Sequence, residues 1–189
     1  MDTVVRIQLL RRLGVVVVAM TFALMVLGSW VKATGSGLAC PDWPQCYGQW
    51  LPPFPSSENG GQWEGRDVPY TQAQVLYEWG HRGLASLLGP VAFAFAWLAV
   101  RGHELHPVLR YLPGTAGIVL VIQIFIGGAT VLQGNPAAIT TLHLATATLF
   151  FGMMVASAVF AFLRPRPTVA PLVRREPGVV RTVYPGEDA

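Results

Sequence analysis

"YEWGHRGLASLLGP", residues 77–90, is the stretch that decides the fold, because it joins charged residues to a long apolar segment. It opens with Glu78, His81 and Arg82 and runs directly into a segment long enough to cross a bilayer. A charged group at membrane depth costs on the order of 3 kcal/mol on insertion scales. We therefore expect a partner or a ligand that offsets this cost beside the three side chains.

The composition is typical of a membrane protein. Of the 189 residues, 52% are hydrophobic and 12% are charged, whereas a soluble domain carries roughly 25% charged residues. The apolar excess falls in four blocks, each near the length that spans a bilayer: about 13–31, 83–100, 112–132 and 138–163. They lack the alternation of barrel strands, so the sequence predicts an all-α membrane protein with a bundle of four transmembrane helices.

The first block has an alternative interpretation as a signal peptide, because arginines precede it. Its apolar stretch is long for that purpose, and Val31-Lys32-Ala33 is a poor cleavage site. We expect a retained helix.

The arginines lie at what would be one end of this bundle, before the first block, between the second and third, and after the fourth. They are Arg6, Arg11, Arg12, Arg101, Arg110, Arg164, Arg166, Arg174, Arg175 and Arg181. The loop after the first helix is acidic instead, with Asp42, Glu58, Glu64 and Asp67 against one Arg66. The positive-inside rule then predicts cytoplasmic termini and an outside loop in the cell (plasma) membrane. The net charge of +3 reflects topology, and we expect no nucleic-acid binding.

We expect three parts along the chain: a cytoplasmic N-terminus (1–12), a four-helix transmembrane domain (13–163) and a basic, disordered cytoplasmic tail (164–189). The transmembrane domain includes an extracytoplasmic loop, residues 34–76, that carries both cysteines.

A weak internal repeat relates the two predicted helical hairpins. "LGSWVKATGS" (27–36) resembles "IGGATVLQGN" (126–135), and "HRGLASLL" (81–88) resembles "HLATATLF" (143–150). The alignment matches Gly28 with Gly127 and Gly35 with Gly134. Each hairpin thus carries one histidine at the same place, as in parallel repeats related by an axis along the membrane normal.

His81 and His143 are therefore the candidate ligands of a metal or cofactor. Both are expected one or two turns into their helices, within roughly 10 Å of the outer boundary. Two histidines at matched depth on different helices can hold one haem iron axially. The alternative is that each histidine only forms an interhelical hydrogen bond. His103 and His106, in the predicted cytoplasmic link, receive no role.

Glu78 precedes His81 by three residues and Arg82 by four, so the three share one helix face. One interpretation gives Arg82 to a haem propionate and leaves Glu78 facing the ring. The other is a simple ion pair between Glu78 and Arg82. The two are compatible, because the pair would hold the carboxylate in place.

Cys40 and Cys46, in "CPDWPQC", are the two cysteines of the sequence. On the outside of a membrane, a pair at this spacing most simply forms a disulfide. A metal site is less favoured because the loop has no histidine and no second cysteine pair. The spacing leaves open whether a disulfide is structural or redox-active.

The sequence resembles the haem A synthase (CtaA) family in three segments: "GSWVKATGSGLACPDWPQCYG" (28–48), "YEWGHR" (77–82) and "TTLHLATA" (140–147). The resemblance covers most of residues 10–163. It implies that His81 and His143 are haem ligands and that Glu78 is the catalytic carboxylate. It also implies that Cys40 and Cys46 form the family's disulfide.

The function implied by this resemblance is oxidation of a ring methyl of haem O to the formyl of haem A, by successive hydroxylations and loss of water. Haem b, haem O or both are the implied cofactors. Membrane lipid, a haem O synthase, cytochrome oxidase and an electron donor are the expected partners. The alternative is a non-enzymatic bis-histidine b-type cytochrome or haem carrier. Glu78 favours an enzyme, since an electron carrier needs no carboxylate beside the ring.

The chain departs from the family pattern in length. Usual members have eight helices in two four-helix halves, each with its own histidine pair, one half for substrate haem and one for a resident haem b. This sequence contains one half. We expect a homo-oligomer in which identical subunits supply both sites; pairing with another chain and loss of catalysis are the alternatives.

Overall fold

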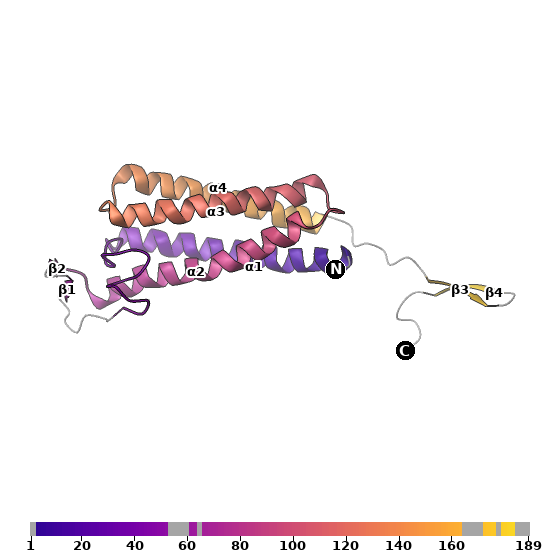
Figure 1. Ribbon diagram of the computed structural model, residues 1–189, viewed down its shortest axis with the longest axis horizontal. Coiled ribbons are helices and arrows are strands. Elements are labelled where there is room, and N and C mark those ends of the chain that lie inside the picture. Colours follow the sequence, from indigo (N-terminus) through magenta and orange to yellow (C-terminus); the bar gives the residue numbers. More distant parts are fainter. Residues whose placement is uncertain (1–2, 53–60, 64–65, 164–171, 177–178, 184–189) are drawn as a thin grey trace.

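The body of the protein is a bundle of four long helices (Figure 1). The structure is a computed structural model, which describes residues 3–52, 61–63, 66–163, 172–176 and 179–183. They are α1 (Thr3–Ala33), α2 (Gln72–Val100), α3 (Pro107–Leu132) and α4 (Ala137–Leu163). Each is long and apolar enough to cross a membrane. The predicted fold class, an all-α membrane bundle, is confirmed.

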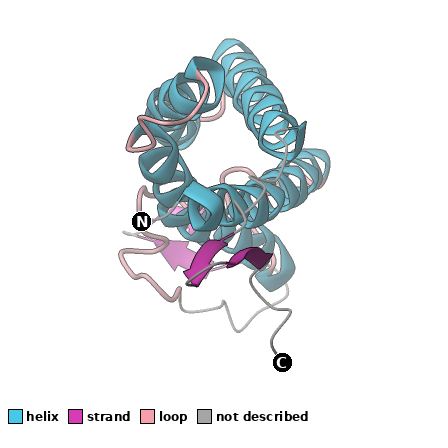
Figure 2. Cartoon of the chain, turned by 90° about the vertical axis from the view of Figure 1, so that its right-hand side faces the viewer, coloured by secondary structure: helices cyan, strands magenta, loops and turns pink. Residues whose placement is uncertain are grey.

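The helices form a ring in chain order, with α4 returning to lie beside α1 (Figure 2). In the described part of the chain, no α-carbons of the diagonal pairs, α1 with α3 and α2 with α4, approach within 8 Å. The two candidate histidines are therefore carried by helices at opposite corners, His81 by α2 and His143 by α4.

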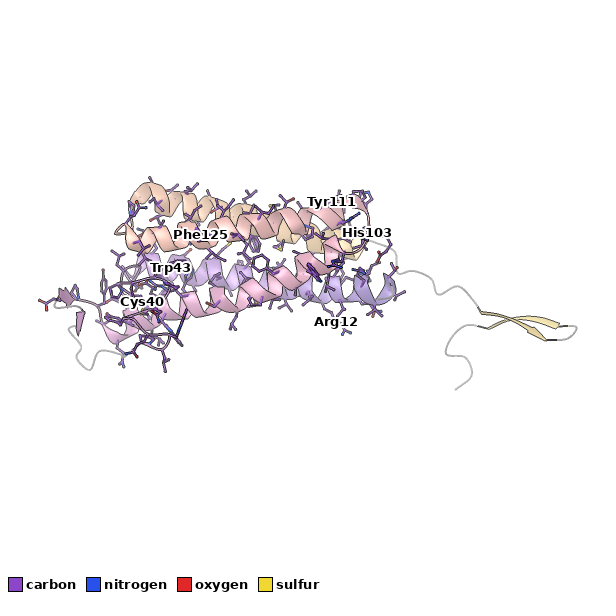
Figure 3. All side chains as sticks on the ribbon, in the orientation of Figure 1. Arg12, Cys40, Trp43, His103, Tyr111 and Phe125 are labelled. Carbon is purple, nitrogen blue, oxygen red and sulfur yellow. A yellow bond between two sulfur atoms is a disulfide. The ribbon has the colours of Figure 1, made fainter. Side chains whose placement is uncertain are left out.

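The two ends of the bundle differ in character. α1 begins and α4 ends at the same end, where Arg12 and His103 also lie (Figures 1 and 3). The loop with Cys40 and Trp43 lies at the other end (Figure 3). This is the arrangement that the arginine distribution requires, and the assignment of one end to the cytoplasm stays a prediction.

The apolar core fills the half of the bundle opposite the cysteine loop. Its largest fully buried side chains come from all four helices: Leu10, Val17, Leu88, Phe95, Leu109, Phe150 and Met154. On α2 the core cluster begins at Leu88, seven residues after His81, and on α4 it begins at Phe150, seven residues after His143. Both histidines thus lie about 10 Å from the start of this packed core along their helices.

The sequence repeat has a structural counterpart at the ends of α1 and α3. Gly28 and Gly127 each lie five residues before the last residue of their helix. Gly35 and Gly134 each lie two residues beyond that end, with φ of +66° and +74°. This left-handed conformation after a helix favours glycine. The two hairpins therefore end their first helix in the same way.

α2 begins at Gln72, well before the apolar block predicted at 83–100, because Thr71 caps it. The Gln74 N–H donates to Thr71 Oγ1, and the Thr71 N–H donates to Gln74 Oε1, which forms a capping box. The Gln74 side chain also donates to the carbonyl of Thr34 at 3.0 Å. The cap ties the start of α2 to the end of α1 and places the whole "YEWGHR" motif inside the helix.

Two short antiparallel hairpins accompany the bundle, β1 (Gly61–Trp63) with β2 (Arg66–Val68), and β3 (Leu172–Glu176) with β4 (Val179–Val183). The second lies in the segment 164–189 for which the sequence predicts disorder. Valine-rich stretches favour strands, which accounts for the difference. Residues 164–171, 177–178 and 184–189 of this tail lie outside the described residues, and the domain boundaries stay predictions.

Candidate functional site

His81 lies against Gly28 of the neighbouring helix α1. A Cβ added to Gly28 would lie 3.0 Å from His81 Nε2, closer than ordinary van der Waals contact. The half-buried imidazole therefore occupies the space that glycine leaves on α1. A larger residue at position 28 would move the ring.

His143 lies against the matching glycine of the second hairpin. A Cβ added to Gly127 on α3 would lie 2.9 Å from His143 Cε1. The other face of the site is polar, because Gln123 Nε2 lies 3.4 Å from His143 Nε2 and the Thr146 hydroxyl donates to Gln123 Oε1. His143 Nδ1 is buried without a hydrogen-bond partner among the described residues. The ring thus has one nitrogen that this part of the chain does not satisfy.

The depths of the two histidines differ slightly when they are counted from the helix starts. His81 is nine residues into α2 and His143 is six residues into α4. The extra residues of α2 come from its early capped start, whereas both distances to the packed core are seven residues. Measured from the start of the packed core, the two histidines therefore lie at the same depth along their helices.

Glu78 is a buried carboxylate, 4% exposed, with both oxygens engaged. The backbone N–H of Cys40 donates to Oε2 at 2.8 Å, and Arg82 Nη2 donates to Oε1 at 2.6 Å. The ion pair expected between Glu78 and Arg82 is present in the structure. The carboxylate also holds the cysteine loop, a contact that the sequence did not predict.

Arg82 fixes the same loop through three carbonyl oxygens. Its Nη1 donates to the carbonyls of Asp42 and Gln45, and its Nη2 donates to that of Cys40 at 3.2 Å. A guanidinium is suited to this task because its donors point in several fixed directions. Both terminal nitrogens are therefore occupied by protein acceptors, which offsets the insertion cost of the charge without a ligand.

The cysteine loop is stabilised from within as well. Cys40 and Cys46 form a disulfide, and both are buried. The Asp42 carboxylate accepts the N–H groups of Tyr47 and Gly48 at 2.7 and 2.8 Å. Burial raises the pKa of the Tyr47 phenol, and the Glu78 carboxylate raises it further. Tyr47 thus borders the charged cluster as a neutral group.

Trp43 joins this loop to the second hairpin. A Cβ added to Gly128 on α3 would lie 2.8 Å from the Trp43 ring, so the indole packs directly on that glycine. Trp43 therefore reaches from the loop after α1 to α3, at the end of the bundle where Cys40 also lies (Figure 3). The "DWP" within the cysteine motif was the available signal, but sequence alone could not pair it with the Gly127-Gly128 step.

The donor set suits a haem better than a bare metal ion. In the described part of the chain, no three His, Cys, Asp or Glu side chains gather as a metal site, and both cysteine sulfurs are consumed by the disulfide. Histidine imidazoles are among the side chains that hold haem iron in proteins. His81 and His143 supply them, Gly28 and Gly127 leave room for the two imidazoles between the helices, and His143 Nδ1 has no partner among the described residues. The residues present fit the group.

The sequence pattern of one protein family, described as "Cytochrome oxidase assembly protein" (COX15-CtaA), matches residues 11–184. The match spans most of the chain. The chain belongs to this family. The matched range includes all six candidate residues, and the resemblance inferred from the three motifs is confirmed.

Individual relatives agree with this assignment. The chain is 27% identical over 169 residues to a haem A synthase of Shouchella clausii, covering 88% of this chain and 51% of that protein. It is 29% identical over 148 residues to a haem A synthase of Geobacillus kaustophilus, covering 76% and 40%. A protohaem IX farnesyltransferase of Halobacterium salinarum is 28% identical over 134 residues, covering 71% and 26%. No solved structure matches. The chain spans about half or less of each of these relatives.

Proposed function

We propose that this protein binds a haem between His81 and His143 and serves in haem A synthesis. The observation that carries the proposal is the position of the two imidazoles, on helices at opposite corners of the ring and in the half of the bundle outside the apolar core cluster. Two glycines at repeat-related positions give the two imidazoles the room they occupy. The names of the relatives point to the same chemistry.

The proposed reaction is oxidation of a ring methyl of haem O to the formyl of haem A. Haem O is the substrate, and a haem b is the candidate resident cofactor, which would supply the redox chemistry when bound. His81 and His143 would hold iron. Arg82 and Glu78 would border the porphyrin edge and, through the cysteine loop, close the outer end against water.

Glu78 is the proposed catalytic carboxylate, and its surroundings define what it must do. Both oxygens already accept hydrogen bonds, from the Cys40 N–H and from Arg82. In this arrangement Glu78 is a fixed negative charge beside the haem space. A role in proton movement requires exchange of one of these two donors, and the N–H of Cys40 is the weaker one because it carries no charge.

A second candidate function is a non-enzymatic bis-histidine cytochrome or haem carrier, and one observation favours it. Glu78 and Arg82 together make five contacts that hold the cysteine loop and each other. A purely structural clamp would need no more than this. His81 and His143 would hold the iron in this case too, and full ligation by protein would favour electron transfer over oxygen chemistry.

Conversion of haem O separates the two candidates. The purified protein, supplied with haem O, a reductant and oxygen, is expected to yield haem A, identified by extraction and chromatography. The Glu78→Gln variant is expected to bind haem but to lose the conversion. Stable haem binding without any conversion would support the carrier instead.

The catalytic unit is proposed to be a homo-oligomer. The four described helices carry one histidine pair, His81 and His143, whereas a substrate haem and a resident haem need two pairs. Self-association supplies the second set from identical chains. Native mass measured in detergent together with conversion tests this, since a strictly monomeric protein that turns over unaided would contradict it. A haem O synthase, cytochrome oxidase and an electron donor are the proposed partners.

The protein is a multi-pass membrane protein, and we propose the plasma membrane with both termini cytoplasmic. The arginine-rich end then faces the cytoplasm and the disulfide loop faces outward. Thiol labelling of Cys40 and Cys46 in intact cells is expected to succeed only after the disulfide is reduced. It should not require the cells to be lysed. Labelling that appears only after lysis would overturn this orientation.

A further inference from the structure

An apolar groove of ≈ 560 Å³ runs between α2 and α3 on the outside of the bundle. Its walls include Phe93, Trp97 and Val100 on α2, and Gly114, Gly117 and Ile118 on α3. The rim side chains are open to the surroundings, with Trp97 61% exposed and Ile118 64% exposed. The groove lies in the half of the bundle away from the histidines, at the arginine-rich end.

Two guanidinium groups are fixed at the end of this groove by its own lining residues. Arg101 stacks over the Trp97 ring, with its Cζ 4.2 Å from the ring centroid. Arg110 donates from Nε to the carbonyl of Val100 at 3.1 Å. Glu104, the acidic residue at this end within the described helices and their connections, is paired with Arg6 at 2.8 Å. Positive charge therefore gathers at the end of the groove formed by the α2–α3 connection.

We propose that this groove binds an anionic phospholipid, with one acyl chain between α2 and α3 and the phosphate between Arg101 and Arg110. The apolar walls match a hydrocarbon chain, and the two guanidiniums match an anionic headgroup. Basic pockets between transmembrane helices recognise anionic headgroups in this way. The site is independent of the haem proposal, because it shares no residue with it.

A second copy of the chain fits the same groove less well. Two copies in one membrane have the same orientation, and a twofold interface places the same patch of each against the other. Arg101 and Arg110 of both copies would then meet at one end with like charge. A lipid phosphate neutralises the two guanidiniums instead, which is why the charge pattern favours the lipid.

The test is native mass spectrometry of the full chain released from nanodiscs of phosphatidylglycerol and phosphatidylethanolamine with identical acyl chains in equal amounts. The wild-type protein is expected to retain phosphatidylglycerol preferentially. The double variant Arg101→Gln/Arg110→Gln should reduce that preference by about fivefold for each guanidinium removed. Arg12→Gln, which removes an exposed charge at the same end but away from this groove, should leave the preference unchanged.

A third variant tests the groove itself. A Cβ at Gly117 would lie 3.8 to 3.9 Å from Phe93 and Ala96, so there is room for a small side chain. Gly117→Leu should fill the groove and lower retention of both lipids, whereas Gly117→Ala should not. Circular dichroism checks that each variant keeps its helices.

Three results would overturn the proposal. They are equal retention of both lipids by the wild-type protein, an Arg12→Gln effect as large as that of the double variant, and a dimer that Gly117→Leu disrupts without change in bound phosphatidylglycerol. The last would assign the groove to a second copy.

Discussion

Each of the two hairpins carries one histidine. A glycine at the equivalent position packs against each histidine, whereas the polar contacts around the two histidines differ. His81 and His143 both lie against a glycine five residues from the end of the preceding helix. Around His81 the supports are charged, with the Glu78–Arg82 pair tied to a disulfide loop. Around His143 they are neutral, with Gln123 hydrogen-bonded to Thr146.

The equivalent glycines and the different polar contacts indicate which part of the repeat the site needs. A glycine that makes room for the imidazole is present in both hairpins, so this feature belongs to the haem site that we propose. The charged clamp, formed by Glu78 and Arg82, is present in the first hairpin only, among the described residues. There the connection between the helices is long, and the clamp fixes it to α2. The second connection spans residues 133–136 and needs no such clamp.

The largest expected effect is loss of the clamp in the first hairpin. Arg82→Gln leaves the buried Glu78 carboxylate without its cation and three loop carbonyls without their donor. We expect the free energy of unfolding to fall by about 3 kcal/mol, the lower range for breaking a buried pair. Denaturant unfolding in detergent measures it. Arg82→Lys should recover part of the loss, because one ammonium cannot reach all four acceptors.

The disulfide should contribute the next largest effect, confined to the same hairpin. Reduction of Cys40–Cys46 with a phosphine is expected to lower stability by about 2 kcal/mol, as a small closed loop implies. Hydrogen exchange should rise at residues 36–50 and at the start of α2, but not in α4. The Cys40→Ser/Cys46→Ser variant, treated identically, is the control. Equal exchange in both hairpins would mean that the loop stabilises the whole bundle.

The glycines should have matched, smaller effects on the two histidines. Gly28→Ala and Gly127→Ala each add a Cβ at 3.0 Å or less from an imidazole atom. We expect each to weaken haem retention by roughly tenfold, which is about 1.4 kcal/mol of overpacking. Gly83→Ala and Gly152→Ala, which meet nothing within 4 Å, are the controls. A response at one glycine alone would break the proposed equivalence of the hairpins.

The smallest effect is expected from the neutral contact in the second hairpin. Removal of the Gln123–Thr146 hydrogen bond should cost about 0.6 kcal/mol, the average for such bonds between membrane helices. A double-mutant cycle with Gln123→Ala and Thr146→Val measures the coupling. A coupling as large as the Arg82 effect would show that both hairpins are held with equal strength.

Much of the fold could be predicted from the sequence because it depends on local patterns. Four apolar blocks predict four helices, and the matched glycines in the sequence indicate the repeat. The helix starts were less accessible: α2 begins about eleven residues before its apolar block, since Thr71 and Gln74 cap it and polar residues fill its first turns. A hydropathy pattern does not detect a capping box, because its residues are polar.

The candidate residues could be named from the sequence, whereas most of the contacts that connect them could not. His81, His143, Glu78 and Arg82 were identified from spacing, and the ion pair between the last two follows from a four-residue offset. The contacts of Arg82 with loop carbonyls join residues about forty positions apart. Such long-range backbone contacts leave no periodic trace in a sequence. The same holds for Trp43 against Gly128, which joins the two hairpins.

The absorption spectrum of the purified protein, for wild type, His81→Ala and His143→Ala, tests the central claim most directly. A haem held between the two imidazoles predicts a low-spin, six-coordinate spectrum in the wild type. Each substitution should abolish it, to the same extent in both hairpins, while the protein remains in the membrane. Retention of the wild-type spectrum by both variants would contradict the assignment of these histidines as haem ligands.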